Sequence, residues 1–130
     1  MILLVDDNKI SRDIVRKWLE NAGFHSHAIV DATSGGLAFN VFMYNADRVQ
    51  AVLTDVMFNE TQSIKDGVEL VELIRQFEQD TSTEKPVYIL AFSSDSKFAA
   101  LILEAGGDMF LQKPLKRQQI VELVKAHYVA

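Results

Sequence analysis

The sequence predicts an α/β fold in which a five-stranded parallel sheet is covered by helices on both faces. Short apolar runs alternate with longer stretches of helical periodicity, and this pair of elements occurs five times along the 130 residues. The first run, Ile2-Leu-Leu-Val5, is apolar at every position, which is typical of a strand buried on both faces. Strict alternation of strands and helices favours parallel strands joined by right-handed crossovers.

Each later element is assigned from its hydrophobic spacing and from the residues that end it. Apolar side chains recur at helical spacing from Ile10 to Ala22, and Gly23 ends this first helix. Residues 24–30 are more polar and are predicted to form a strand at the edge of the sheet. The remaining elements are a helix over residues 34–45, strands over 51–54, 87–92 and 109–111, and helices with apolar stripes through 70–77, 98–105 and 120–127.

Residues 1–130 are predicted to form a single domain. Its composition excludes several classes of function. The net charge is −5 and the basic residues are scattered, so direct binding to nucleic acid is not expected. The chain has no cysteine, which excludes disulfides, thiol catalysis and Cys-ligated zinc. The apolar start from Met1 to Val5 is far too short for a signal peptide or a membrane span, so we expect a cytoplasmic protein without a membrane partner.

Polar and charged side chains follow four of the predicted strands. Asp6 and Asp7 follow the first strand, Asp55 ends the third, Ser93 and Ser94 follow the fourth, and Lys113 follows the fifth. Ligands of open parallel sheets bind beyond the carboxyl ends of the strands, where we expect these residues to meet. Three carboxylates repel one another unless a cation lies among them, and their oxygens suit Mg²⁺, or else Mn²⁺.

The same set suggests phosphoryl chemistry. A lysine adds a positive charge for a phosphate, and aspartate is a known nucleophile toward phosphoryl groups. Taken singly, each residue has a simpler explanation: Asp7 or Asn8 would serve as a helix N-cap, and Lys113 as a surface lysine. The combination is more specific than its parts, and it predicts a Mg²⁺-assisted phosphorylation site.

Over essentially its whole length the chain resembles the receiver domains of two-component signalling proteins. The resemblance rests on the acidic pair and on three segments, Leu53-Thr-Asp-Val-Met-Phe58, Asp66-Gly-Val-Glu-Leu70 and Ala105-Gly-Gly-Asp-Met-Phe-Leu-Gln-Lys-Pro114. It implies a doubly wound, flavodoxin-like sheet with strand order 2-1-3-4-5 and five helices.

The resemblance also implies roles for individual residues. Asp55 would be the phosphoacceptor, and Asp6, Asp7, Asp55 and the backbone carbonyl of Met57 would surround Mg²⁺. Lys113 would contact the phosphoryl group, and the bond between Lys113 and the proline after it would be cis, as only a proline readily allows.

Two features depart from the family pattern near the site. Asn59 replaces a proline, and the loop over residues 59–66 is about four residues longer than is usual in the family. The switch hydroxyl of the fourth strand is ambiguous: counting back from Lys113 without gaps gives Ala91, whereas the local pattern favours Ser93. The aromatic switch position is Phe110, which has no phenol hydroxyl.

These observations favour a signalling module that is not an enzyme beyond its own phosphorylation and dephosphorylation. A histidine kinase or a histidine phosphotransfer protein would supply the phosphoryl group, and a downstream effector protein or domain would respond. Two alternatives are a Mg²⁺-dependent phosphatase, for which the chain lacks a cap region, and a degenerate receiver that serves only as an interaction module. His25 and His27, two apart on the predicted edge strand, are expected to be surface residues.

Overall fold

The computed structural model describes residues 1–58 and 63–129, and its centre is a single parallel sheet. The strands are β1 (Ile2–Val5), β2 (Ile29–Ala32), β3 (Ala51–Asp55), β4 (Tyr88–Ser93) and β5 (Met109–Gln112). They lie in the order β2-β1-β3-β4-β5, and every neighbouring pair is parallel. The chain winds outwards from β1 to β2, crosses back to β3 and continues to β5, which confirms the predicted doubly wound fold.

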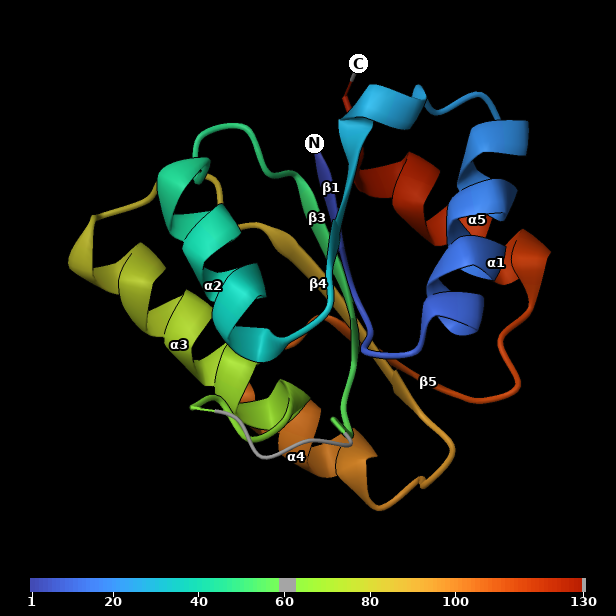
Figure 1. Ribbon diagram of the computed structural model, residues 1–130. Coiled ribbons are helices and arrows are strands. Elements are labelled where there is room, and N and C mark those ends of the chain that lie inside the picture. Colours follow the sequence, from blue (N-terminus) through green and yellow to red (C-terminus); the bar gives the residue numbers. More distant parts are fainter. Residues whose placement is uncertain (59–62, 130) are drawn as a thin grey trace.

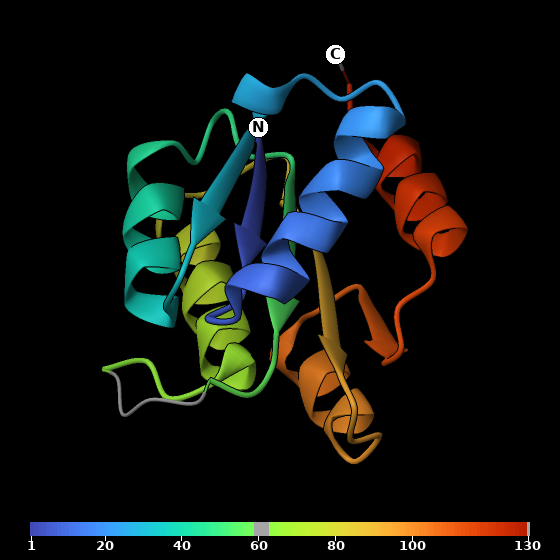
Figure 2. The ribbon, with the colours of Figure 1, turned by 45° about the vertical axis from the view of Figure 1, so that its right-hand side comes forward.

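Helices cover both faces of the sheet (Figure 1). One face carries α1 (Lys9–Asn21) and α5 (Arg117–His127), and the other carries α2 (Gly35–Tyr44), α3 (Gly67–Asp80) and α4 (Phe98–Ala105). Figure 2 shows the strands running toward one end of the molecule, away from the two termini. That end carries the predicted site residues.

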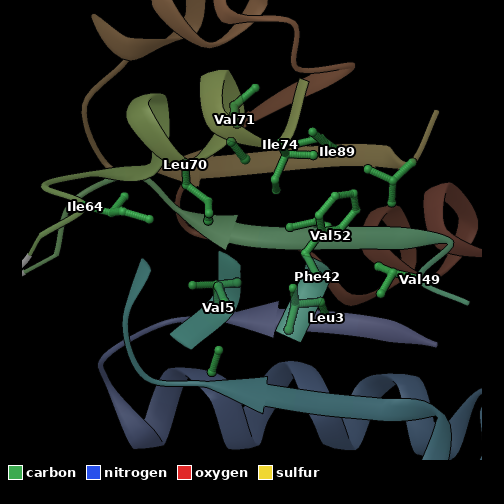
Figure 3. Packing of buried hydrophobic residues seen from close by; sticks show 14 of the residues in the cluster. Leu3, Val5, Phe42, Val49, Val52, Ile64, Leu70, Val71, Ile74 and Ile89 are labelled. Carbon is green, nitrogen blue, oxygen red and sulfur yellow. The ribbon is translucent and has the colours of Figure 1, made fainter. Parts of the chain in front are cut away.

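Successive residues of each strand point to opposite faces, so the sheet has two hydrophobic cores. In β1, Leu3 and Val5 pack on the side of α2 and α3, whereas Ile2 and Leu4 pack on the side of α1 and α5, and all four are fully buried. Figure 3 shows the first core, where Phe42 of α2 lies among residues of the central strands and α3. A strand placed between two cores has to be apolar at every position, which explains the composition of β1.

The second strand lies at the edge of the sheet, as predicted, but the prediction that it covers residues 24–30 is wrong. Residues Ser26–Ala28 form a short 3₁₀ helix, η1, and β2 begins only at Ile29. The backbone N–H of His27 donates to Nδ1 of His25, which stabilises this turn in place of a strand. The two histidine rings therefore meet edge to face, with centroids 4.8 Å apart, on an exposed turn.

Polar side chains define where α1 and α3 begin at the site end of the sheet. The Asn8 side chain accepts a hydrogen bond from the backbone N–H of Ser11, and the Asp66 side chain accepts one from Glu69. Asn8, rather than Asp7, is therefore the N-cap of α1. The caps fix both helix starts beside the ends of β1 and β3.

Gly67 allows α3 to approach the end of β3 closely. Its backbone N–H donates to the carbonyl of Val56 over 2.7 Å. A Cβ atom on Gly67 would lie 2.6 Å from the carbonyl oxygen of Asp55 and 2.8 Å from Cα of Val56. Only glycine fits this contact between backbones, so the residue directly supports the segment that carries Asp55.

We expect Gly67→Ala to lower the free energy of unfolding by about 1–3 kcal/mol, because the added methyl group displaces backbone atoms in a packed region. Urea denaturation measures the change. Gly36→Ala is the matched control, since its Cβ would meet only the Ser63 hydroxyl at 3.4 Å and alanine favours the helix. Equal stability of Gly67→Ala and the wild type would show that α3 does not need this close approach.

Candidate functional site

Asp6 lies at the end of β1, where its backbone and its side chain are both held. Its backbone N–H donates to the carbonyl of Ala32 in β2 over 3.1 Å. One carboxylate oxygen accepts a hydrogen bond from the backbone N–H of Asn8 over 2.9 Å. The residue is 2% exposed, which is unusual for an aspartate and indicates a role for the buried carboxylate.

Asp55 ends β3 next to Asp6, because Thr54 pairs with Val5 in the sheet. Carboxylate oxygens of Asp6, Asp7 and Asp55 all lie within 4.8 Å of one another. The Thr54 hydroxyl donates to the carbonyl of Asp55 over 2.8 Å and is fully buried. The structure thus brings together the three aspartates that the sequence singled out.

Lys113 reaches the same point from the end of β5. Its Nζ lies 3.5 Å from Oδ2 of Asp55, and its backbone N–H donates to the carbonyl of Ser93 over 2.9 Å. The peptide bond between Lys113 and Pro114 is cis, as the resemblance implied. Lys113 therefore brings a positive charge to the cluster of three carboxylates.

Ser93, and not Ala91, lies at the carboxyl end of β4. Ala91 pairs with Thr54, lies two residues before the end of β4 and belongs to the hydrophobic core. Asp55 pairs with Phe92, which places Ser93 just beyond the acidic cluster. The Ser93 hydroxyl accepts a hydrogen bond from the backbone N–H of Asp95 over 3.1 Å and is buried.

The structure also places the two remaining residues of the predicted site, Met57 and Phe110. The backbone of Met57 pairs with Asp66 in an antiparallel bridge, while its side chain is 53% exposed. Phe110 pairs with Ala91 in the sheet, and its partly buried ring packs against the core on the side of α4. The long loop after Met57 lies partly outside the described residues, Asn59 included.

Burial sets the charge state of the acidic cluster in the absence of a cation. It raises the pKa of Asp55 to about 6, with the neighbouring Asp6 acting in the same direction and Lys113 opposing both. Burial also raises the pKa of Asp6. Holding these carboxylates close together therefore costs free energy through burial and repulsion. A bound cation would reduce the repulsion between them.

Arg12 is a residue near the site that the sequence did not reveal. It lies in the first turns of α1, is 9% exposed, and donates from one Nη to the backbone carbonyl of Asp6 over 2.8 Å. From hydrophobic spacing alone, Arg12 would be placed on the polar, exposed face of the helix. A charged residue at a buried helix position is recognised once the packing is known.

The sequence matches the profile of the response regulator receiver domain over residues 2–125. The chain therefore belongs to the response regulator receiver family, the phosphoacceptor signalling domains of two-component systems. It is 33% identical over 126 residues to the peroxide stress-activated histidine kinase mak2 of Schizosaccharomyces pombe. It is 35% identical over 125 residues to the transcriptional regulatory protein CseB of Streptomyces coelicolor.

These two matches cover 95% and 96% of this chain but only 5% and 47% of the relatives, so the chain spans less than half of either protein. Solved structures share the fold. A co-crystal structure of the Saccharomyces cerevisiae phosphotransfer protein Ypd1 with the receiver domain of Ssk1 matches at a TM-score of 0.82 and 22% identity, over 97% of this chain and 86% of that chain. The structure of a putative response regulator from Chloroflexus aurantiacus matches at a TM-score of 0.78 and 26% identity, over 96% of this chain and 93% of that chain.

Within residues 1–58 and 63–129, no helix combines the length and the apolar character needed to cross a bilayer. The longest, α3, has 14 residues.

We expect Asp55→Asn to raise the free energy of unfolding by about 1–2 kcal/mol at pH 7 without divalent cations, because it removes one of the crowded charges. The folded-state pKa of Asp55 is raised to about 6, so wild-type stability is lost as the pH rises from about 4 through 6. The gain from Asp55→Asn should therefore shrink toward pH 4. Urea denaturation at a series of pH values measures it.

The exposed Asp47 on the loop after α2 supplies the control, since Asp47→Asn should change stability by less than about 0.5 kcal/mol at any of these pH values. A constant difference between Asp55→Asn and the wild type from pH 4 to 7 would contradict the assigned cause.

Proposed function

We propose that residues 1–130 act as a receiver unit in which Asp55 accepts a phosphoryl group from phosphohistidine. The observation that carries the proposal is the geometry of the acidic cluster: three aspartates with carboxylate oxygens within 4.8 Å, and Lys113 3.5 Å from one of them. Such a cluster provides a nucleophile and positive charge at one partly buried point.

The proposed reaction is a simple displacement. A carboxylate oxygen of Asp55 attacks phosphorus, the bond from phosphorus to the imidazole nitrogen breaks, and the histidine leaves as the neutral ring after taking up a proton. The product is an acyl phosphate on Asp55, which water can later hydrolyse. Lys113 is placed to neutralise charge on the transferring group, so catalysis rests on positioning and electrostatics.

The cluster also fits a divalent cation. All of its donors are oxygens, which suits Mg²⁺ or Mn²⁺ and excludes a thiolate type of site. We propose Asp6, Asp7, Asp55 and the backbone carbonyl of Met57 as the residues that would hold it. When bound, the cation would neutralise the carboxylates and polarise phosphoryl oxygens.

The relatives support the choice of partners. Ssk1 is a response regulator whose receiver was crystallised with the phosphotransfer protein Ypd1, mak2 is a histidine kinase, and CseB is a transcriptional regulator. We propose that a histidine kinase or a histidine phosphotransfer protein donates the phosphoryl group to this chain in the cytoplasm. A downstream effector protein or domain would read the result.

Ser93 and Phe110 are the proposed switch. The Ser93 hydroxyl lies just beyond the strand position opposite Asp55. Its oxygen accepts a bond from the backbone N–H of Asp95, and its O–H would donate to a phosphoryl oxygen. Its movement would leave space for Phe110, which packs beside α4. Because Phe110 has no hydroxyl, its inward position would rest on packing alone.

The full set of Asp6, Asp7, Asp55 and Lys113 at one point favours this function over a degenerate receiver that acts only as an interaction module. The phosphatase alternative lacks support from the sequence next to the nucleophile, since Val56 and Met57 follow Asp55 and neither can act as a general acid or base.

Incubation with acetyl phosphate and Mg²⁺ should add one phosphoryl group to the wild-type protein and none to Asp55→Asn, because Asp55 is the nucleophile. Intact-mass spectrometry measures the added mass. Asp95→Asn is the control, because it removes a carboxyl group near the end of a neighbouring strand and should still allow one phosphoryl group to be added.

The same assay tests the cation. EDTA should suppress the added mass, and Asp7→Ala should require at least about tenfold more Mg²⁺, since it removes one of the charged ligands. Phosphorylation of Asp55→Asn to the wild-type level would disprove the proposed function, and an unchanged Mg²⁺ requirement in Asp7→Ala would remove Asp7 from the ligand set.

Ser93→Ala should leave the phosphorylation of Asp55 intact but prevent the response of α4 and Phe110, because alanine cannot form the charge-assisted bond, worth about 1.5–3 kcal/mol. NMR chemical shifts of α4 and Phe110, with and without beryllofluoride and Mg²⁺, report the response. In Ser94→Ala, which removes the exposed neighbouring hydroxyl, the shifts should match the wild type. Loss of the response in Ser94→Ala alone would assign the switch to Ser94.

A further inference from the structure

A buried arginine behind the acidic cluster is not explained by the chemistry proposed for Asp55. Arg12 is 9% exposed, although arginine is among the residues least often buried. Burying a guanidinium is costly unless it is paired and hydrogen-bonded. Its Nε has no hydrogen-bond partner among the described residues and lies 3.8 Å from the nearest carboxylate oxygen of Asp31. A side chain kept buried at this cost requires a reason.

The reason lies in the atom that Arg12 contacts. One Nη donates to the backbone carbonyl of Asp6 over 2.8 Å. Asp6 follows the last residue of β1, where the chain leaves the sheet and turns into α1, and its buried carbonyl needs a donor. Arg12 supplies that donor from α1, and so joins the two ends of the turn over residues 6–8.

Arg12 contacts the carbonyl of Asp6 and not its carboxylate. The carboxylate accepts a hydrogen bond from the backbone N–H of Asn8. Arg12 therefore holds Asp6 in place without bonding the negatively charged oxygens that a cation needs as ligands. Lys113, in contrast, faces the carboxylate of Asp55 directly. The two positively charged side chains, Arg12 and Lys113, therefore have different roles at the cluster.

We propose that Arg12 is a positioning residue that holds the turn carrying Asp6 and Asp7 in the geometry required to bind a divalent cation. The proposal builds on the proposed function, since it concerns the same cation. It does not make Arg12 a ligand or a catalytic residue. Partners that orient metal ligands typically change metal affinity by about 10- to 100-fold when they are removed.

Arg16 on the next turn of α1 provides a matched control. It bonds Asp31 over 2.9 Å and the carbonyl of Ile29 over 2.6 Å, so its loss also removes an ion pair and a backbone contact between α1 and β2. Among the interactions of the described residues, Arg16 has no hydrogen bond or ion pair to the turn over residues 6–8. If Arg12 only stabilised the fold, Arg12→Met and Arg16→Met would behave alike toward the cation.

The test uses NMR on the full chain and has a metal-free part. In Arg12→Met, hydrogen exchange at the amide of Asn8, which donates to Asp6, should accelerate at least about tenfold relative to the wild type, and in Arg16→Met it should not. Exchange in a central strand, for example at Leu53, checks that both variants remain folded. Unchanged exchange at Asn8 in folded Arg12→Met would overturn the proposal.

The second part is a MgCl₂ titration at constant ionic strength, followed by the amide shifts of residues 6–8 and 55–57. Arg12→Met should bind Mg²⁺ about tenfold more weakly and Arg16→Met within about twofold of the wild type. Arg12→Lys keeps the charge without the planar fork, and it should also bind more weakly. Because loss of the positive charge alone would strengthen Mg²⁺ binding, equal or tighter binding by Arg12→Met overturns the proposal.

The two parts separate failure of this inference from failure of the proposed function. A wild-type protein that does not bind Mg²⁺ would contradict the proposed cation site, while the exchange of Asn8 would still show whether Arg12 fixes the turn. A wild-type protein that binds Mg²⁺, with Arg12→Met binding equally well, contradicts only the role of Arg12.

Discussion

The crowding of three carboxylates at the ends of β1 and β3 is the constraint on which the rest of this structure depends. Asp6 and Asp55 are held on neighbouring strands by the register that pairs Val5 with Thr54, so they cannot move apart without breaking the sheet. Burial raises the pKa of both carboxyl groups, and repulsion acts in the same direction, from Asp7 on Asp6 and from Asp6 on Asp55. The fold thus stores an unfavourable interaction at the point where a cation and a phosphoryl group would bind.

Several elements can be understood as supports for that point. Gly67 lets α3 lie directly against the carbonyl of Asp55, and the Thr54 hydroxyl donates to the same carbonyl. Lys113 brings a compensating charge from the end of β5, and Arg12 holds the carbonyl of Asp6 from α1. Three of these four supports contact backbone atoms, and Lys113 contacts a carboxylate oxygen. A site prepared in this way has less to reorganise when it is occupied.

The neighbourhood of β4 and β5 suggests how occupancy could be transmitted. Ser93 lies at the strand end, where its hydroxyl oxygen accepts one backbone hydrogen bond and its O–H can still donate a bond to a phosphoryl oxygen. Phe110 lies on β5 opposite Ala91, which is two residues before Ser93 in β4, and its ring packs against the core. Because Phe110 has no phenol hydroxyl, a change in the position of its ring would depend on packing alone.

The sequence by itself determined the order of elements, the two-sided burial of the central strands and the identity of the acidic cluster. Patterns such as Ile2 to Val5 are local, since burial on both faces excludes polar residues from the strand itself. The strand-end positions of Asp6, Asp55 and Lys113 follow from the rule for parallel sheets, because each residue needs only its own strand boundary to be found.

The tertiary structure decided what depends on partners distant in the chain. Residues 24–28 do not form the predicted strand, because pairing with β1 begins at Ile29. The backbone N–H of His27 is instead bonded locally by the side chain of His25. The pairing of β4 with β3 placed Ser93, rather than Ala91, at the strand end, where counting along the sequence left both open. Hydrophobic periodicity could not identify Arg12, because its role depends on a hydrogen bond to the carbonyl of Asp6, which lies outside α1. Hydrophobic spacing records which side chains are buried, whereas register and long-range hydrogen bonds exist only after the strands have met.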